Sequence, residues 1–228
     1  MKVIQNLVSP TKYSIKCPYT MKAEFFIVHN TANDASAINE VKYMIRNNAQ
    51  VSYHYAIDDK NIVQGIPDNR NAWNAGDGGR GRGNRKGLSF EICYSKSGGQ
   101  KFIAAEKLAA KFLAFKLKEK GWGINKVTKH QDYSGKYCPH RTLDMGWQRF
   151  LNMIQVELNA LNTPQPQQPI QETIKVSFNG TIRNVPGKFV NGTNSILIQG
   201  KYFSIREVAE SMGFVVGWDQ ANKVVLLK

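Results

Sequence analysis

The sequence lacks any continuous apolar run of about 18 residues, the length that a membrane-spanning helix needs, so we expect no membrane insertion. The N-terminal stretch has an early lysine but neither the apolar core nor the small-residue cleavage site of a secretory signal, which predicts synthesis as a cytosolic protein. Only three cysteines occur, Cys17, Cys93 and Cys138, so at least one is unpaired and a disulfide framework is excluded. This cysteine usage suits a reducing compartment.

Acidic residues are also scarce. The chain has 17 Asp and Glu against 31 Lys and Arg, a formal net charge of +14. Such an excess predicts attraction to a polyanion, which could be nucleic acid, an anionic membrane or the teichoic-acid-rich bacterial wall. Charge alone does not choose among these partners.

Histidine is rare, and its distribution divides the chain. All four histidines and all three cysteines precede residue 162. The segment 162–173, "NTPQPQQPIQET", has three prolines, four glutamines and no aromatic residue, which predicts an extended, semi-rigid linker, with an ordered surface loop as the alternative. We therefore expect a catalytic domain at 1–161 that holds the chemistry, and a smaller domain at 174–228.

Strand and helix patterns alternate in the first domain. Short apolar or alternating runs at 24–30, 52–58, 61–66 and 88–94 predict strands, and apolar residues at helical spacing predict helices at 34–48, 102–121 and 142–161. Asn33 and Asp34 are candidate caps of the first helix, and Gly121 is a candidate left-handed cap of the second. This order predicts an α/β fold with a central mixed β-sheet flanked by helices.

The second domain is predicted as a small α+β unit. Strand patterns occur at 174–179, 195–199 and 223–228, and a short helix pattern ends at Gly213.

The stretch "KHQDYSGKYCPHRT", residues 129–142, places His130 and Cys138 eight residues apart across a Ser-Gly pair that lets the chain loop back. His29 ends the apolar strand 24–30, where its side chain can project from a sheet edge. Two imidazoles and a thiolate are a donor set that zinc accepts, with the fourth position left to water. The spacing alone leaves an alternative, in which Cys138 is a small buried hydrophobe and the histidines lie on the surface.

Four motifs in fixed order, "FFIVHNTA", "SYHYAID", "NRKGLSFEICYS" and "KHQDYSGKYCPHR", resemble the zinc-dependent N-acetylmuramoyl-L-alanine amidases shared by phage endolysins, bacterial autolysins and animal peptidoglycan recognition proteins. The resemblance covers roughly residues 20–160. It implies one zinc ion held by His29, His130 and Cys138. It also implies peptidoglycan as substrate, cut between N-acetylmuramic acid and L-alanine.

The same resemblance implies roles for further residues. Glu91, on the strand 88–94, matches the general base, with a salt-bridged strand residue as the alternative. Lys136 matches the lysine that stabilises the oxyanion, although a solvated loop lysine is the alternative. Tyr53 matches a tyrosine that donates to the substrate carbonyl or to the zinc-bound water. His54 is expected to support the site from behind without binding zinc, and His140 to be structural.

The segment 74–87, "NAGDGGRGRGNRKG", is similar in composition to an arginine-glycine box that binds nucleic acid. It has no repeats and no interleaved aromatic residues, and the resemblance makes it a flexible loop beside the substrate groove. We therefore expect no nucleic-acid partner.

The C-terminal segment resembles the small domain named after the N-terminal stalk of copper amine oxidases, through "IREVAESMG" and the following "GWD". It has no histidine or cysteine, so we expect no copper there. Cell-wall binding is the expected role, with an inert spacer or a dimerising module as alternatives.

These observations predict a phage endolysin for host lysis that acts on the cell wall, binding peptidoglycan and possibly anionic wall polymers. A prophage enzyme or an autolysin would share the sequence features. The alternative class is a non-catalytic peptidoglycan-binding protein on the same fold, which typically lacks the third zinc ligand. A lysozyme-type glycosidase needs two carboxylates flanking one bond, and the sequence reveals no partner for Glu91.

Overall fold

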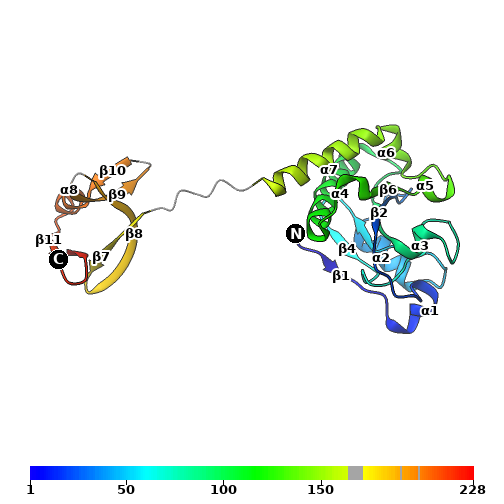
Figure 1. Cartoon of the computed structure of the whole chain (residues 1–228), viewed down its shortest axis with the longest axis horizontal. Coiled ribbons are helices and arrows are strands. Elements are labelled where there is room, and N and C mark those ends of the chain that lie inside the picture. Colours follow the sequence, from blue (N-terminus) through cyan, green and yellow to red (C-terminus); the bar gives the residue numbers. More distant parts are fainter. Residues whose placement is uncertain (164–171, 191, 200) are drawn as a thin grey trace. The chain divides into compact units, whose positions relative to one another are not determined.

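The chain, described here by a computed structural model over residues 1–163, 172–190, 192–199 and 201–228, divides into two units, Met1–Thr163 and Pro164–Lys228 (Figure 1). The linker predicted at 162–173 falls largely on residues 164–171, which lie outside the described residues. Its extended conformation stays a prediction.

A six-stranded mixed sheet forms the centre of the first unit, with strand order β1-β4-β3-β5-β2-β6. Only the β3–β4 pair is antiparallel, and the other named pairs of this sheet are parallel. This confirms the predicted mixed sheet. The strands are β1 (Ile4–Gln5), β2 (Phe25–Asn30), β3 (Tyr55–Ile57), β4 (Ile62–Gln64), β5 (Gly87–Ile92) and β6 (Val127–Lys129).

Helices cover both faces of this sheet (Figure 1). Apolar residues of α4 and α7 share the larger core with Phe26, Val28 and Phe90, whereas α2 packs with Ala56 and Val63 on the opposite face. The helices are α1 (Tyr13–Lys16), α2 (Ala37–Arg46), α3 (Arg82–Lys86), α4 (Gly99–Lys120), α5 (Gln131–Ser134), α6 (His140–Asp144) and α7 (Trp147–Asn162), with short 3₁₀ turns at Pro10–Lys12 and Ile124–Lys126.

The start of α2 differs from the sequence prediction. Ser36 caps the helix, because its hydroxyl accepts a hydrogen bond from the Asn39 backbone N–H at 3.4 Å. The two predicted caps bind elsewhere: Asn33 donates to Glu40 on α2, and the Asp34 carboxylate accepts hydrogen bonds from Ser97.

Three other predicted elements can be compared with the structure at their ends or at a break. Gly121 closes α4 with φ of 65°, which confirms the predicted left-handed cap. The single helix predicted at 142–161 is instead two, α6 and α7, because Gly146 between them has φ of 101°, far outside helical values. Strand β5 ends at Ile92, two residues before the predicted end, and Tyr94 turns the chain with φ of 60°.

The second unit contains one helix and a six-stranded sheet of order β10-β9-β8-β7-β12-β11 within its described residues. Its small core includes Ile174, Val176, Ile205 and Val225. The predicted strands and helix are present, and three further strands complete an α+β arrangement. The elements are β7 (Thr173–Phe178), β8 (Thr181–Val190), β9 (Thr193–Ile198), β10 (Lys201–Ser204), α8 (Ile205–Ser211), β11 (Val216–Asp219) and β12 (Val224–Leu227).

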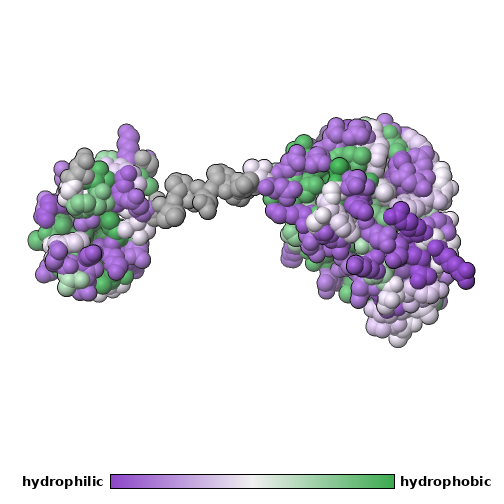
Figure 2. Space-filling view, in the orientation of Figure 1, coloured by the Kyte–Doolittle hydropathy of each residue, from purple (hydrophilic) through white to green (hydrophobic). Residues whose placement is uncertain are grey.

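Of the helices in the described ranges, none has both the length and the apolar character that crossing a bilayer requires. The visible face of the first unit is mostly hydrophilic (Figure 2).

A buried ion pair joins α4 to α7. Arg149 Nη2 donates to both carboxylate oxygens of Glu106, at 2.8 and 2.7 Å, and the Glu106 side chain is only 1% exposed. The pair fixes how the two helices pack, because the buried Glu106 carboxylate is not tolerated there without the partly exposed Arg149.

Arg149→Met should therefore destabilise the first unit by about 3 kcal/mol, since it leaves the Glu106 carboxylate buried without its partner. Urea unfolding measures the change. The double variant Glu106→Leu/Arg149→Met is the control, and it should recover most of the loss because no charge remains buried. A single variant that unfolds at the parental urea concentration would contradict this account.

Candidate metal centre

Three neighbouring strands bring Glu91, His29 and His130 side by side. In the parallel pairing of β2 with β5, His29 lies directly opposite Glu91. On the other side, Val28 of β2 pairs with Lys129 of β6, and His130 follows as the next residue, its backbone N–H donating to the Val28 carbonyl at 3.3 Å.

The alternation of side chains along these strands sends the polar groups to one face. Phe26 and Val28 on β2, and Phe90 on β5, lie in the core beneath α4. Their neighbours His29 and Glu91 therefore point to the opposite face, away from the larger core.

Cys138 reaches the same place through a return loop. Helix α5 ends at Gly135, which has φ of 74° and reverses the chain. The Cys138 carbonyl then accepts a hydrogen bond from the Gln131 backbone N–H at 3.0 Å, which holds the loop against the start of α5. The predicted looping across the Ser-Gly pair is thus present.

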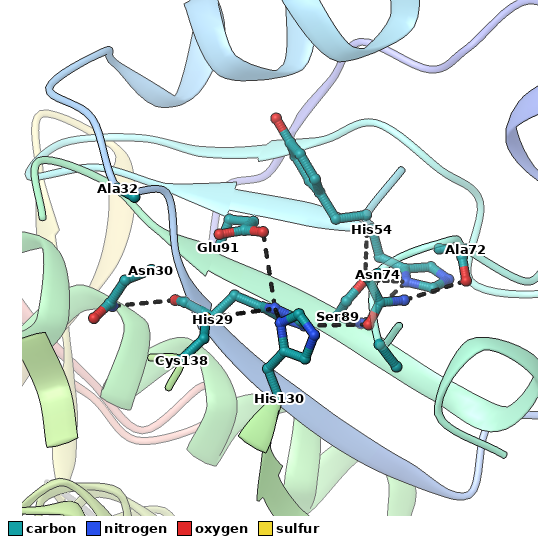
Figure 3. A network of polar contacts seen from close by, with 12 residues as sticks. His29, Asn30, Ala32, His54, Ala72, Asn74, Ser89, Glu91, His130 and Cys138 are labelled. Atoms are coloured by element: carbon teal, nitrogen blue, oxygen red, sulfur yellow. Dashed lines mark hydrogen bonds and ion pairs between the residues drawn. The ribbon is translucent and has the colours of Figure 1, made fainter. Parts of the chain in front are cut away.

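The donor atoms of the two histidines and Cys138 lie within 4.8 Å of one another. The two Nδ1 atoms are 3.1 Å apart, and Cys138 Sγ is 3.9 Å from His29 Nδ1. Figure 3 shows the three side chains pointing toward one another, with Glu91 beside them. All three are buried, so the alternative of surface histidines was wrong.

This donor set fits a bound metal ion. Burial lowers the pKa of His29 well below its ordinary value and also lowers that of His130, so both imidazoles are neutral, as metal ligands must be. Burial raises the pKa of the Cys138 thiol to about 12, and a coordinated cation is what would ionise a thiol in such a place.

Asn74 orients His29 and was missed by the sequence analysis. Its amide nitrogen donates to the Ala72 carbonyl at 3.2 Å, so its Oδ1 faces His29 Nε2, at 3.1 Å (Figure 3). His29 therefore carries its proton on Nε2 and keeps the Nδ1 lone pair for a ligand. No spacing rule singles out this asparagine, because it lies in an irregular loop.

Glu91 is the acidic group of the site. Its Oε1 is 4.0 Å from His29 Nδ1, too far for a hydrogen bond, and its buried Oε2 has no partner among the described residues. Burial, reinforced by the charge of Glu40, raises the pKa of Glu91 to about 8. A buried carboxylate oxygen without a protein donor is free to bind a substrate group or a water molecule.

Glu40 on α2 is a second carboxylate near Glu91, which the sequence analysis did not identify. Its oxygens bind Asn33, at 2.5 Å, and the Tyr53 hydroxyl, which donates at 3.4 Å. The Tyr53 hydroxyl thus faces Glu40. Burial, with the Glu40 charge, raises the pKa of Tyr53 and keeps it protonated.

His54 lies behind the site and donates nothing to the ligand cluster. Its Nδ1 is 3.0 Å from Ser89 Oγ (Figure 3). Its Nε2 is 2.9 Å from the Arg70 carbonyl. Ser89 is two residues before Glu91 on β5, so His54 braces the strand that carries the carboxylate. His140 binds the Ser95 carbonyl at 3.3 Å, which fits the structural role expected for it.

A cavity of about 540 Å³ opens beside the cluster, lined by His130, Lys136, Trp73, Asn74 and Gly78 among others. Lys136 is exposed at its rim, and its positive charge is among the causes that lower the pKa of His130. The position of Lys136 fits a cation that faces a bound substrate.

The loop 74–87 forms part of this cavity and is held by its own side chains. Asp77 accepts hydrogen bonds from the Gly83 and Asn84 backbones, and Asn84 Oδ1 accepts from the Asn74 and Ala75 backbones at 2.8 Å. It also contains the short helix α3, which the sequence analysis did not predict in this expected flexible loop.

Lys16 supports the segment with Gln50 and Val51, which also lines the cavity, and was missed by the sequence analysis. Its ammonium, in a residue with no exposed surface, donates to Asn47 Oδ1 and to the carbonyls of Ala49 and Val51, at 2.9, 2.6 and 3.0 Å. Gln50 and Val51 line the cavity. Lysines are usually exposed, so no sequence pattern distinguishes this one.

Comparisons with known proteins match the part of the chain that holds this site. A family model described as N-acetylmuramoyl-L-alanine amidase matches residues 19–141. The N-acetylmuramoyl-L-alanine amidase CwlA of Bacillus subtilis (strain 168) is 59% identical over 162 residues, 71% of this chain and 60% of the relative. The amidase XlyB of the same organism is 59% identical over 159 residues, 69% of this chain and 50% of the relative.

A solved structure, of PlyL, is 52% identical with a TM-score of 0.66 and covers 68% of this chain and 97% of that one. The chain spans about 60% of the length of CwlA and about half of the length of XlyB. The matched segment 19–141 contains His29, Glu91, His130 and Cys138. The chain therefore belongs to the N-acetylmuramoyl-L-alanine amidase family.

Proposed function

We propose that the protein is a peptidoglycan hydrolase that cleaves the amide bond between N-acetylmuramic acid and the L-alanine of the stem peptide. The observation that carries the proposal is the convergence of His29, His130 and Cys138 beside the partnerless Oε2 of Glu91, next to an open cavity. Membership of the amidase family supports the choice of bond.

Zinc is the ion we propose for the site, held by His29, His130 and Cys138. Two nitrogens and one sulfur match its preferred donors, and three protein ligands leave a position open. When bound, zinc supplies a Lewis acid that polarises the scissile carbonyl and lowers the pKa of water.

Glu91 is proposed as the general base and acid. Its pKa of about 8 leaves only a minority of the carboxyl ionised at pH 7, and the positive charge of a bound cation would raise that share. Oε2 takes a proton from the attacking water, and the same carboxyl then delivers a proton to the leaving nitrogen of L-alanine. Because no protein donor occupies Oε2 among the described residues, the atom is available for this transfer.

Lys136 and Tyr53 are proposed to act on the substrate. The exposed ammonium of Lys136 at the cavity rim would stabilise negative charge that develops on the carbonyl oxygen. The protonated Tyr53 hydroxyl, held by Glu40, would turn toward the substrate carbonyl when substrate enters. His54 would keep β5 in place through Ser89.

We also propose a biological role as a phage endolysin that acts on the bacterial wall after synthesis in the host cytoplasm. The first unit has 24 of the chain's 31 Lys and Arg residues and 13 of its 17 Asp and Glu residues. Its basic residues therefore outnumber its acidic ones, and this positive charge would favour binding to anionic wall polymers. The second unit is proposed to bind the wall. A non-catalytic binding protein remains the alternative, but the complete donor set and the adjacent carboxylate favour the enzyme.

Digestion of purified bacterial walls tests the reaction. We expect new N-terminal alanine and no new reducing sugar ends, with activity removed by a zinc chelator and restored by zinc. New reducing ends would indicate a glycosidase, and wall binding without new ends would indicate a non-catalytic protein.

Glu91→Gln should lower turnover by roughly 10²- to 10⁴-fold while zinc content stays at the parental level, because the change removes proton transfer and leaves the metal donors. Cys138→Ala is the paired variant, and it should lose zinc and activity together. Zinc analysis and wall-clearing rates measure both. A fully active Glu91→Gln enzyme would remove Glu91 as the base.

Asn74→Ala should weaken zinc binding by roughly 10- to 100-fold, because His29 loses the acceptor that fixes its Nε2 proton. Asn74→Asp keeps an oxygen acceptor at this position and should retain most of the affinity. Titration against a competing chelator gives the dissociation constants. Equal affinity in all three proteins would show that Asn74 does not orient His29.

A further inference from the structure

The second unit contains a pocket of about 440 Å³, within the size range of small-ligand sites. It lies between the β8–β9 hairpin, the start of α8 and strand β11. In the hairpin Phe189 pairs with Asn194, so one ring and one amide are neighbours at the pocket edge. The buried side chains of Ile205 and Val225 also line it.

Two aromatic residues flank this pocket and remain open to solvent. Phe189 is 68% exposed and Trp218 is 46% exposed. Single exposed aromatic rings are common on protein surfaces. Two exposed rings that line the same pocket instead form an apolar surface on which a ligand can pack.

Polar groups complete the lining. The Trp218 indole N–H donates to Gln220 Oε1 at 2.6 Å, which fixes the direction of the Gln220 amide. Arg206 donates to Glu210 at 3.2 Å, so the one guanidinium at the pocket is charge-balanced by a neighbour. The pocket thus offers aromatic faces and neutral hydrogen-bonding groups rather than a concentration of charge.

We propose that this pocket binds saccharide units of the peptidoglycan glycan strand. A pyranose ring has apolar C–H faces that stack on aromatic rings, and its hydroxyl and acetamido groups pair with amides such as those of Asn194 and Gln220. This inference rests on the proposed peptidoglycan function. It assigns the wall-binding role of the second unit to named residues.

The charge of the unit favours a glycan, which carries one carboxylate on each peptide-free N-acetylmuramic acid, over a polymer with a phosphate in every repeat. The segment 164–228 has seven Lys and Arg residues and four Asp and Glu residues, and the guanidinium at the pocket is already paired. A phosphate-rich polymer would need several unpaired cations at one place. The basic excess of the protein belongs mainly to the first unit.

The test uses the full chain and a peptide-free tetrasaccharide of alternating N-acetylglucosamine and N-acetylmuramic acid, which has no scissile amide. The protein has four tryptophans, so four indole N–H signals report binding by NMR, and Trp218→Phe assigns the signal of Trp218. We expect the Trp218 signal to shift on titration. A shift confined to Trp73, which lines the cavity of the first unit, would overturn the proposal.

Trp218→Ala should weaken tetrasaccharide binding roughly tenfold or more, and Trp218→Phe should weaken it less because a ring remains. Phe203→Ala is the matched control, since Phe203 is an aromatic residue of the same unit, 44% exposed, that does not line the pocket. It should bind like the parent. Thermal unfolding of each variant shows whether the unit stays folded.

Hydrolysis of a small soluble muramoyl-peptide separates this inference from the proposed function. Trp218→Ala should cleave that substrate at the parental rate. If the parent binds the glycan through Trp218 but cleaves nothing, the proposed function fails and the glycan pocket stands. If Trp218→Ala binds the glycan as tightly as the parent, or the parent binds poly(glycerol phosphate) and not the glycan, the pocket proposal fails.

Discussion

The parallel register of β5, β2 and β6 is the constraint on which the site depends. It sets Glu91 opposite His29 on the next strand, and the residue after β6 is His130. Because side chains alternate along a strand, a shift of β2 by one residue would turn His29 into the core beneath α4 and bring Val28 to the site. Phe26 and Phe90, which fill that core, therefore also hold the strand register that positions the candidate metal centre.

Polar groups buried around the sheet extend this constraint to the loops. Asn74 orients His29, Ser89 and His54 brace β5, and Lys16 ties the wall containing Val51 to the N-terminal segment. Ser89, His54 and Lys16 are buried and Asn74 is half-buried, and each makes hydrogen bonds, whereas Glu91 Oε2 is left without a donor among the described residues. Four buried side-chain atoms of the described residues lack a partner, on Thr31, Asn71, Arg85 and Glu91, and Glu91 Oε2 is the one that belongs to a carboxylate.

Sequence reasoning reached the parts of this arrangement that periodicity and motif order encode. The mixed sheet, the long helix closed by Gly121 and the grouping of His29, His130 and Cys138 were all predictable, since each depends on local pattern or on the four motifs. Asn74 and Lys16 were not, because their roles come from contacts between segments far apart in the chain, and Glu40 was not, because its place near Glu91 depends on how α2 packs on the sheet. The break at Gly146 was missed because apolar spacing continues across it.

A metal ion between His29, His130 and Cys138, with Glu91 beside it, is the proposal from which the reaction follows. A crystal structure of the zinc-loaded protein, with anomalous scattering measured at the zinc edge, is the decisive test. One peak is expected, at about 2.0–2.1 Å from Nδ1 of each histidine and about 2.3 Å from Cys138 Sγ. A zinc peak elsewhere, or a site that excludes any of the three residues, would contradict it.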